Sequence, residues 1–100
     1  MMTNRYIKYT SEALEDLFNL NAYIEMDCKS PYTARIYMTE LEERIQMLGY
    51  CADSFPVVPE LTEMYHKPVK RVNYKNMAVI FSIEEYVVIE RIIPQSMVIY

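Results

Sequence analysis

The last third of the chain constrains the fold most strongly, because residues 70–94 read KRVNYKNMAVIFSIEEYVVIERIIP. Three short runs in this segment are rich in β-branched and aromatic residues, which favour strands. The dipeptides at 75–76 and 84–85 separate the runs and predict tight turns. We therefore expect three consecutive antiparallel strands, over residues 69–74, 77–83 and 86–93.

The middle and last runs differ in their patterns of apolar residues. The middle run, MAVIFSI, is almost wholly apolar, as expected of a strand that is covered on both faces. The last run alternates, which predicts one wetter face. Its two faces are expected to hold Val87, Ile89 and Arg91 on one side and Val88, Glu90 and Ile92 on the other.

Two helices precede these strands. Apolar residues at helical spacing predict a first helix over about residues 11–26, with Thr10 or Ser11 as its N-cap. Ser30 and Pro31 are typical of a second helix start, and Gly49 is expected to end that helix in a left-handed C-cap. Only a few residues join the two helices, so we expect an antiparallel hairpin.

The whole chain, residues 1–100, is expected to form one domain. RYIKY at 5–9 predicts a first strand, and residues 50–69 hold three prolines without a sustained period, which predicts a long loop. The resulting order is βααβββ, an α+β fold with an antiparallel sheet packed on the helical hairpin. The expected core residues are Leu14, Leu17, Phe18, Tyr37, Leu41, Ile45, Val79, Phe81 and Ile89.

Composition and charge exclude several classes of protein. The net charge of −4 argues against a protein that coats nucleic acid. Two cysteines without metal-ligand spacing are expected to be reduced thiols, and neither a signal peptide nor a membrane-spanning stretch is read. We therefore expect a cytoplasmic protein that does not contact the membrane. No cluster of metal ligands and no Gly-rich phosphate loop occurs, so no cofactor is expected.

One stretch departs from this acidic balance. Between His66 and Lys75 the chain carries four basic residues and no acid. This stretch predicts a surface for phosphate groups or an acidic partner. Its basic members are Lys67, Lys70, Arg71 and Lys75.

Four segments, taken in order, resemble a known family. They read YIKYTSEALEDLFNLNAYI, SPYTARIYMTELEERIQML, FPVVPEL and KRVNYKNMAVIFSIEEYVVIERII, and together they cover about residues 5–94. Their order and spacing are similar to those of the RelE/ParE superfamily of toxins from bacterial type II toxin–antitoxin modules, which includes plasmid stabilisation proteins.

The resemblance implies a growth-inhibiting toxin that a cognate antitoxin wraps and neutralises. Ribosome-dependent members of the superfamily cut messenger RNA without a metal, using Arg, Lys, Tyr or His side chains. ParE-like members instead poison DNA gyrase.

The sequence departs from the RNA-cutting pattern at two places. Ala78 stands where cutting members place an arginine in the central strand, and the exit of the last strand reads PQSM rather than holding further basic residues. Both departures favour a ParE-like toxin, or a degenerate member, over a ribonuclease.

Four residues remain candidates for catalysis if the chain is a ribonuclease: Arg71, Tyr74, Lys75 and Arg91. Arg71, with Lys67, Lys70 and Lys75, is equally a candidate for binding a target or nucleic acid. Three of them have a structural alternative: Arg71 and Arg91 can pair with helix carboxylates, and Tyr74 can make a cross-strand aromatic contact on the hairpin rather than stack on a base. His66 is expected to be a solvated loop residue rather than a base, and the paired acids at 42–43 and 84–85 are expected to be solvated.

Three functions therefore stay open: a ParE-like toxin that binds its target, a metal-independent endoribonuclease, and a non-toxic relic. The expected partners are an antitoxin and either gyrase or the ribosome with its mRNA. The apolar residues 97–100 are suited to burial by a partner or by a second copy of the chain, so a homodimer is also an open alternative.

Overall fold

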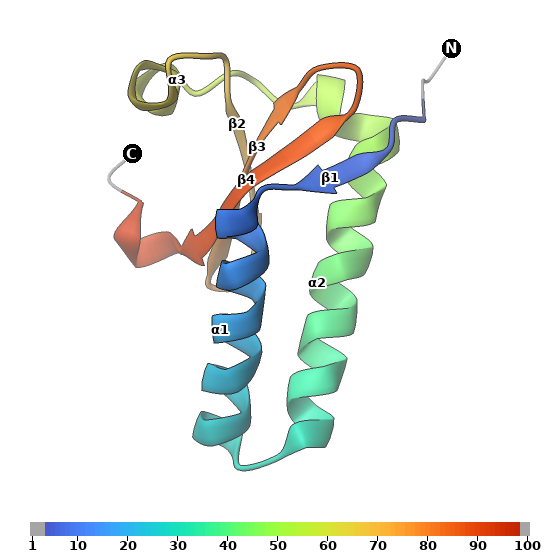
Figure 1. Ribbon diagram of the computed structural model, residues 1–100, viewed down its shortest axis with the longest axis vertical. Coiled ribbons are helices and arrows are strands. Elements are labelled where there is room, and N and C mark those ends of the chain that lie inside the picture. Colours follow the sequence, from blue (N-terminus) through green and yellow to red (C-terminus); the bar gives the residue numbers. More distant parts are fainter. Residues whose placement is uncertain (1–3, 99–100) are drawn as a thin grey trace.

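A computed structural model describes residues 4–98, in which four strands form one sheet and three α-helices pack around it (Figure 1). The order is βααα followed by three strands, with short 3-10 turns after α2 and after β4. The elements are β1 (Ile7–Tyr9), α1 (Ser11–Cys28), α2 (Pro31–Cys51), η1 (Ala52–Ser54), α3 (Pro59–Tyr65), β2 (Lys70–Tyr74), β3 (Met77–Ile83), β4 (Val87–Pro94) and η2 (Gln95–Met97).

The strand order in the sheet is β1-β4-β3-β2. Strands β2, β3 and β4 form the expected antiparallel meander, whereas β1 is parallel to β4, with Ile7 opposite Val87. The sheet is therefore mixed rather than wholly antiparallel. The helical hairpin returns the chain to the end where β1 began, as shown by the bond from the Arg5 N–H to the Gly49 carbonyl (2.9 Å). Strands β2 and β4 consequently run in the direction of β1.

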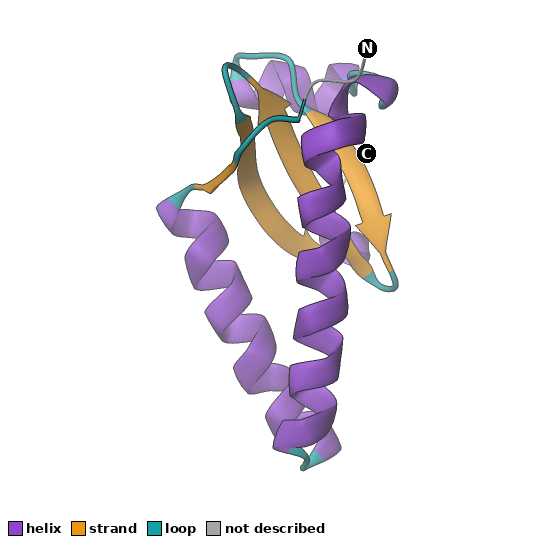
Figure 2. Ribbon diagram, turned by 90° about the vertical axis from the view of Figure 1, so that its right-hand side faces the viewer, coloured by secondary structure: helices purple, strands orange, loops and turns teal. Residues whose placement is uncertain are grey.

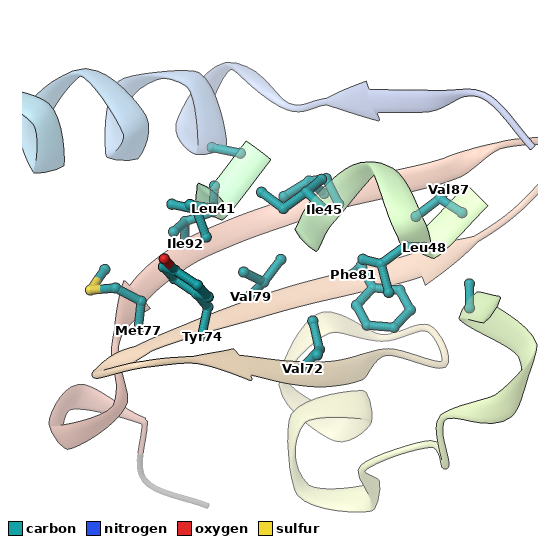
Figure 3. Close-up of a cluster of buried hydrophobic side chains, with 13 residues drawn as sticks. Leu41, Ile45, Leu48, Val72, Tyr74, Met77, Val79, Phe81, Val87 and Ile92 are labelled. Atoms are coloured by element: carbon teal, nitrogen blue, oxygen red, sulfur yellow. The ribbon is translucent and has the colours of Figure 1, made fainter. Parts of the chain in front are cut away.

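The helical hairpin covers one face of the sheet and forms the main core (Figure 3). Leu41, Ile45 and Leu48 of α2 pack on Val79 and Phe81 of β3. Each fully buried aliphatic side chain of this kind stabilises the fold by about 1.5–3 kcal/mol. The predicted α+β fold with its helical hairpin is confirmed.

The opposite face of the sheet carries a smaller core. Leu61 of α3 and Val69 pack on Ile80, beside the partly buried Tyr65 and Val98. Because side chains alternate along a strand, β3 points Val79 and Phe81 to one core and Ile80 to the other. The prediction that MAVIFSI is covered on both faces is confirmed.

Both helices begin where the sequence indicated. The Thr10 hydroxyl accepts a bond from the Ala13 N–H (3.0 Å), and the Ser30 hydroxyl accepts one from the Thr33 N–H (3.2 Å). The prediction for Gly49 is wrong, because α2 continues to Cys51 without a positive φ at this glycine. Gly49 instead permits a close approach: a Cβ there would lie 2.6 Å from the Arg5 carbonyl oxygen.

Two predicted core residues of α1 are wrong. Leu14 is 54% exposed and Phe18 is 73% exposed. The helix turns Ala13, Leu17 and Ile24 toward the rest of the protein instead. The other seven predicted core residues, Leu17, Tyr37, Leu41, Ile45, Val79, Phe81 and Ile89, are all part of the main core or packed against it.

The predicted loop over 50–69 is also wrong, because it contains η1 and α3. Pro59, which suggested irregular structure, occupies the first turn of α3, where proline is tolerated. His66 ends this helix in a left-handed conformation (φ 58°).

A β-bulge interrupts the alternation of β4. Arg91 is opposite Ile80, but the next pair joins Phe81 to Ile89, so Glu90 is the extra residue. As a result Ile89 and Ile92 are both buried in the main core, and the simple alternation predicted for this strand is wrong. Thr10 binds the bulge, donating its hydroxyl to the Glu90 carbonyl (2.9 Å).

Candidate partner-binding site

A groove of about 540 Å³ lies between α1 and the end of β4. Leu20 and Tyr23 of α1 form one side, and Ile93 and Met97 form the other. The amides of Asn19 and Asn76 also line it. The groove therefore combines apolar walls with groups that can bond to a peptide main chain.

Arg91 lies in this groove and is paired with a carboxylate of α1. Its Nε is 2.7 Å from Asp16 Oδ2 and its terminal nitrogen is 3.1 Å from Oδ1. The same carboxylate accepts a bond from the Ile92 N–H (2.9 Å). The hydrogen bond to Asp16 raises the pKa of the Arg91 guanidinium. The structural alternative for Arg91, a salt bridge to a helix acid, is thus observed.

Tyr74 and Lys75 lie at the turn of the β2–β3 hairpin, next to Asn76. The Tyr74 hydroxyl donates to Glu40 Oε2 (2.6 Å), and its ring meets that of Tyr37 edge-on, with centroids 5.3 Å apart. Burial, assisted by the bond to Glu40, raises the pKa of Tyr74 to about 12. Lys75 Nζ is 3.8 Å from the same carboxylate. Tyr74 therefore packs on a ring of α2 rather than on an aromatic residue across the hairpin, and its ring is buried away from any base it could stack on.

Gln95, in the PQSM segment that begins at the end of β4, binds the turn of this hairpin. Its side-chain nitrogen donates to the Lys75 carbonyl (2.6 Å), and its backbone N–H donates to the Asn76 carbonyl (2.8 Å). Arg71 donates to Asn73 Oδ1 (2.8 Å), and its guanidinium also lies 3.5 Å from Gln95 Oε1. The PQSM segment, which lacks basic residues, therefore stabilises the β2–β3 hairpin.

The basic stretch does not assemble into one patch. Lys67 Nζ lies 2.7 Å from the buried Glu90 carboxylate, which raises the pKa of this lysine. Lys70 Nζ donates to the Ala52 carbonyl just after α2 (3.2 Å). Lys70 and Arg71 are consecutive in β2 and so point to opposite faces of the sheet. The catalytic and binding roles of these residues stay predictions.

The remaining sequence candidates are all exposed. His66 follows α3, Glu42 and Glu43 lie on α2, and Glu84 and Glu85 form the turn before β4. Within residues 4–98 no group of three potential metal-ligating side chains comes together. No helix in that part of the chain is long and apolar enough to span a membrane.

The sequence reasoning missed the acids that hold the basic residues, namely Asp16, Glu40 and Glu90. Asp16 had a signal, because it is three residues after the buried Ala13 and four before Leu20, on the side of the helix that packs. Glu90 had none, since a bulge places it and a bulge has no clear pattern in the sequence.

The family model described as "ParE toxin of type II toxin-antitoxin system, parDE" matches residues 7–99. This chain belongs to the ParE toxin family. The predicted membership of the RelE/ParE superfamily is confirmed.

Solved structures agree with this ParE assignment at the level of the fold. The "Chromosomal ParDE TA system from P. aeruginosa" contains a chain with a TM-score of 0.76 and 17% sequence identity. The match covers 91% of this ParE-family chain and 96% of the other. No curated protein sequence matches significantly.

Proposed function

We propose that this ParE-family chain is a cytoplasmic toxin that acts by binding DNA gyrase and that a cognate antitoxin neutralises it. The observation that carries the choice of binding over RNA cleavage is the row Arg71–Ile80–Arg91 across β2, β3 and β4. Neighbouring strands lie about 4.8 Å apart, so the Cα atoms of the two arginines are separated by roughly 10 Å. Ile80, between them, is buried under Leu61 and Val69.

The position of Tyr74, on the opposite face of the sheet, also favours binding over RNA cleavage. Metal-free RNA cleavage needs a base, an acid and a charge stabiliser within hydrogen-bond reach of one phosphate. Tyr74 points into the helix-side core, whereas Arg71 and Arg91 belong to the row on the other face. The sheet therefore separates the Tyr74 ring from the row of the two arginines, which favours binding over cleavage.

Induction of the full chain in growing bacteria tests this proposal. We expect growth arrest with gyrase-linked DNA breaks, and no codon-spaced ends in messenger RNA. Arg71→Ala should then leave RNA ends unchanged. Codon-spaced cuts that fall about 100-fold in Arg71→Ala, the size of effect seen for transition-state stabilisers, would instead favour the ribonuclease. Normal growth would favour the relic.

We further propose that the antitoxin inserts a segment into the groove beside α1. Apolar side chains would fill the space between Tyr23 and Met97, and the amides of Asn19 and Asn76 would bond its main chain. Tyrosine is enriched among the residues that dominate protein–protein binding, and such residues lie near the centre of an interface.

Tyr23→Gln should weaken antitoxin binding roughly tenfold or more, because truncating an aromatic anchor typically costs over 1 kcal/mol. Tyr32→Gln, at an exposed tyrosine on α2, is the matched control and should bind normally. Calorimetric titration with the protein encoded by the neighbouring reading frame measures both. Equal affinity of the two variants would contradict the groove as the antitoxin site.

A further inference from the structure

One side of α1 exposes a continuous line of apolar residues that neither core uses. Leu14, Phe18, Ala22 and Met26 are spaced by four and so follow one another along the helix. All four are exposed, and Met26 is 78% exposed. We call this line, with the acidic residues Glu15 and Glu25 beside it, the outer α1 face.

Most of the outer α1 face points away from the groove. At 3.6 residues per turn, Leu14 and Phe18 point about 180° and about 140° away from Tyr23 around the helix, whereas Met26, at the far end of the line, points only about 60° from it. The groove takes the side with Asp16, Asn19 and Tyr23. The same helix can therefore contact two partners at once.

The helical hairpin is also accessible. Its closed end extends past the sheet, as both views show (Figures 1 and 2). Met26 and Tyr32 lie near that end and are exposed. An apolar line of this kind on a projecting helix is typical of a surface that docks another protein.

Charge identifies the kind of partner that fits. Residues 11–51, which form the hairpin, include eight acids and three bases. A second copy of the chain would bring the same acidic surface, and like charges facing each other disfavour association. A helix with apolar residues at matching spacing and flanking Lys or Arg side chains would complement the outer α1 face.

We propose that the outer α1 face is the surface that docks the toxin's target, and that the target supplies a basic amphipathic helix. This inference rests on the proposed toxin function and deepens it. It separates the surface for the target from the groove that we assign to the antitoxin.

Phe18→Gln in the full chain tests the proposal. We expect growth arrest to be lost and inhibition of purified gyrase to fall at least tenfold, because the variant removes an aromatic anchor. Thermal unfolding and antitoxin affinity should be unchanged, since Phe18 is 73% exposed and outside the groove. Met47→Gln, at an exposed apolar residue of α2, is the matched control and should stay toxic.

The charge of the partner is tested by Glu15→Lys. This reversal beside Phe18 should weaken gyrase inhibition, whereas Glu43→Lys, at an exposed acid of α2, should not. Full toxicity of Phe18→Gln would overturn the docking surface while leaving the toxin function intact. Full inhibition by Glu15→Lys would overturn the basic partner. A parent chain that neither arrests growth nor inhibits gyrase would overturn the proposed function together with this inference.

Discussion

At the scale of single residues, the basic and aromatic side chains that drew attention in the sequence serve mainly to hold elements together. Tyr74 joins β2 to α2 through Glu40, and Arg91 joins β4 to α1 through Asp16. In both cases the partner acid comes from a helix that is far away in the sequence. Residue type therefore identified the groups able to do chemistry, whereas the identity of their partners depended on the tertiary fold.

Tyr74→Phe should destabilise the protein by about 1 kcal/mol at neutral pH, the usual net value of a buried hydrogen bond. The pKa of Tyr74 is raised from 10.0 to about 12 in the folded protein. The hydroxyl therefore contributes its full stability below pH 10, and this contribution is lost as the pH rises from 10 to 12. Denaturant unfolding of parent and variant should show a free-energy difference that shrinks over that range.

Other tyrosines also titrate in alkaline solution, and burial raises the pKa of Tyr9, Tyr37 and Tyr65. The parent protein and Tyr74→Phe share that part of the pH dependence, so only the difference between their unfolding free energies reports on Tyr74. A difference that stays constant up to pH 12 would contradict the raised pKa of Tyr74.

At the scale of elements, the sequence predicts helices and strands that depend on local periodicity. It does not predict which faces of these elements pack together. Ser30 and Pro31 start α2 as expected, and β3 follows its apolar run. On α1, however, apolar residues occur on two sides, and spacing alone cannot tell which side packs. For this reason the pattern predicts Leu14 and Phe18 in the core, although both are exposed. The groove, formed by residues from both ends of the chain, had no sequence signal.

The two N-caps give a matched comparison of elements. Ser30→Ala should cost about 1 kcal/mol, because the cap of α2 is lost together with only an exposed bond from the Thr33 hydroxyl. Thr10→Ala should cost about twice as much, since it loses the cap and also the bond to the Glu90 carbonyl at the bulge. Urea unfolding of the two variants measures both values. Equal losses would mean that the contact between Thr10 and the bulge contributes nothing.

At the scale of the whole molecule, a bound antitoxin should stabilise the toxin. Binding to the folded state alone adds about 2.7 kcal/mol when the free partner is at 100 times its dissociation constant. The melting temperature should therefore rise with antitoxin concentration, as measured by differential scanning calorimetry. Tyr23→Gln should require more antitoxin for the same rise, and Tyr32→Gln should not. A melting temperature that does not change with antitoxin would count against the proposed partnership.

The parallel pairing of β1 with β4 has a consequence for how the chain is made. Ile7 is opposite Val87, so β1 has no neighbour in the sheet until β4 has been synthesised. Contacts so distant in sequence slow folding, because a long loop must close before they form. Until then the α2 residues Leu41, Ile45 and Leu48 can be covered only in part, by β2 and β3. A toxin built in this way completes its sheet only after β4 has been synthesised, so a product that is truncated before β4 cannot form the native sheet.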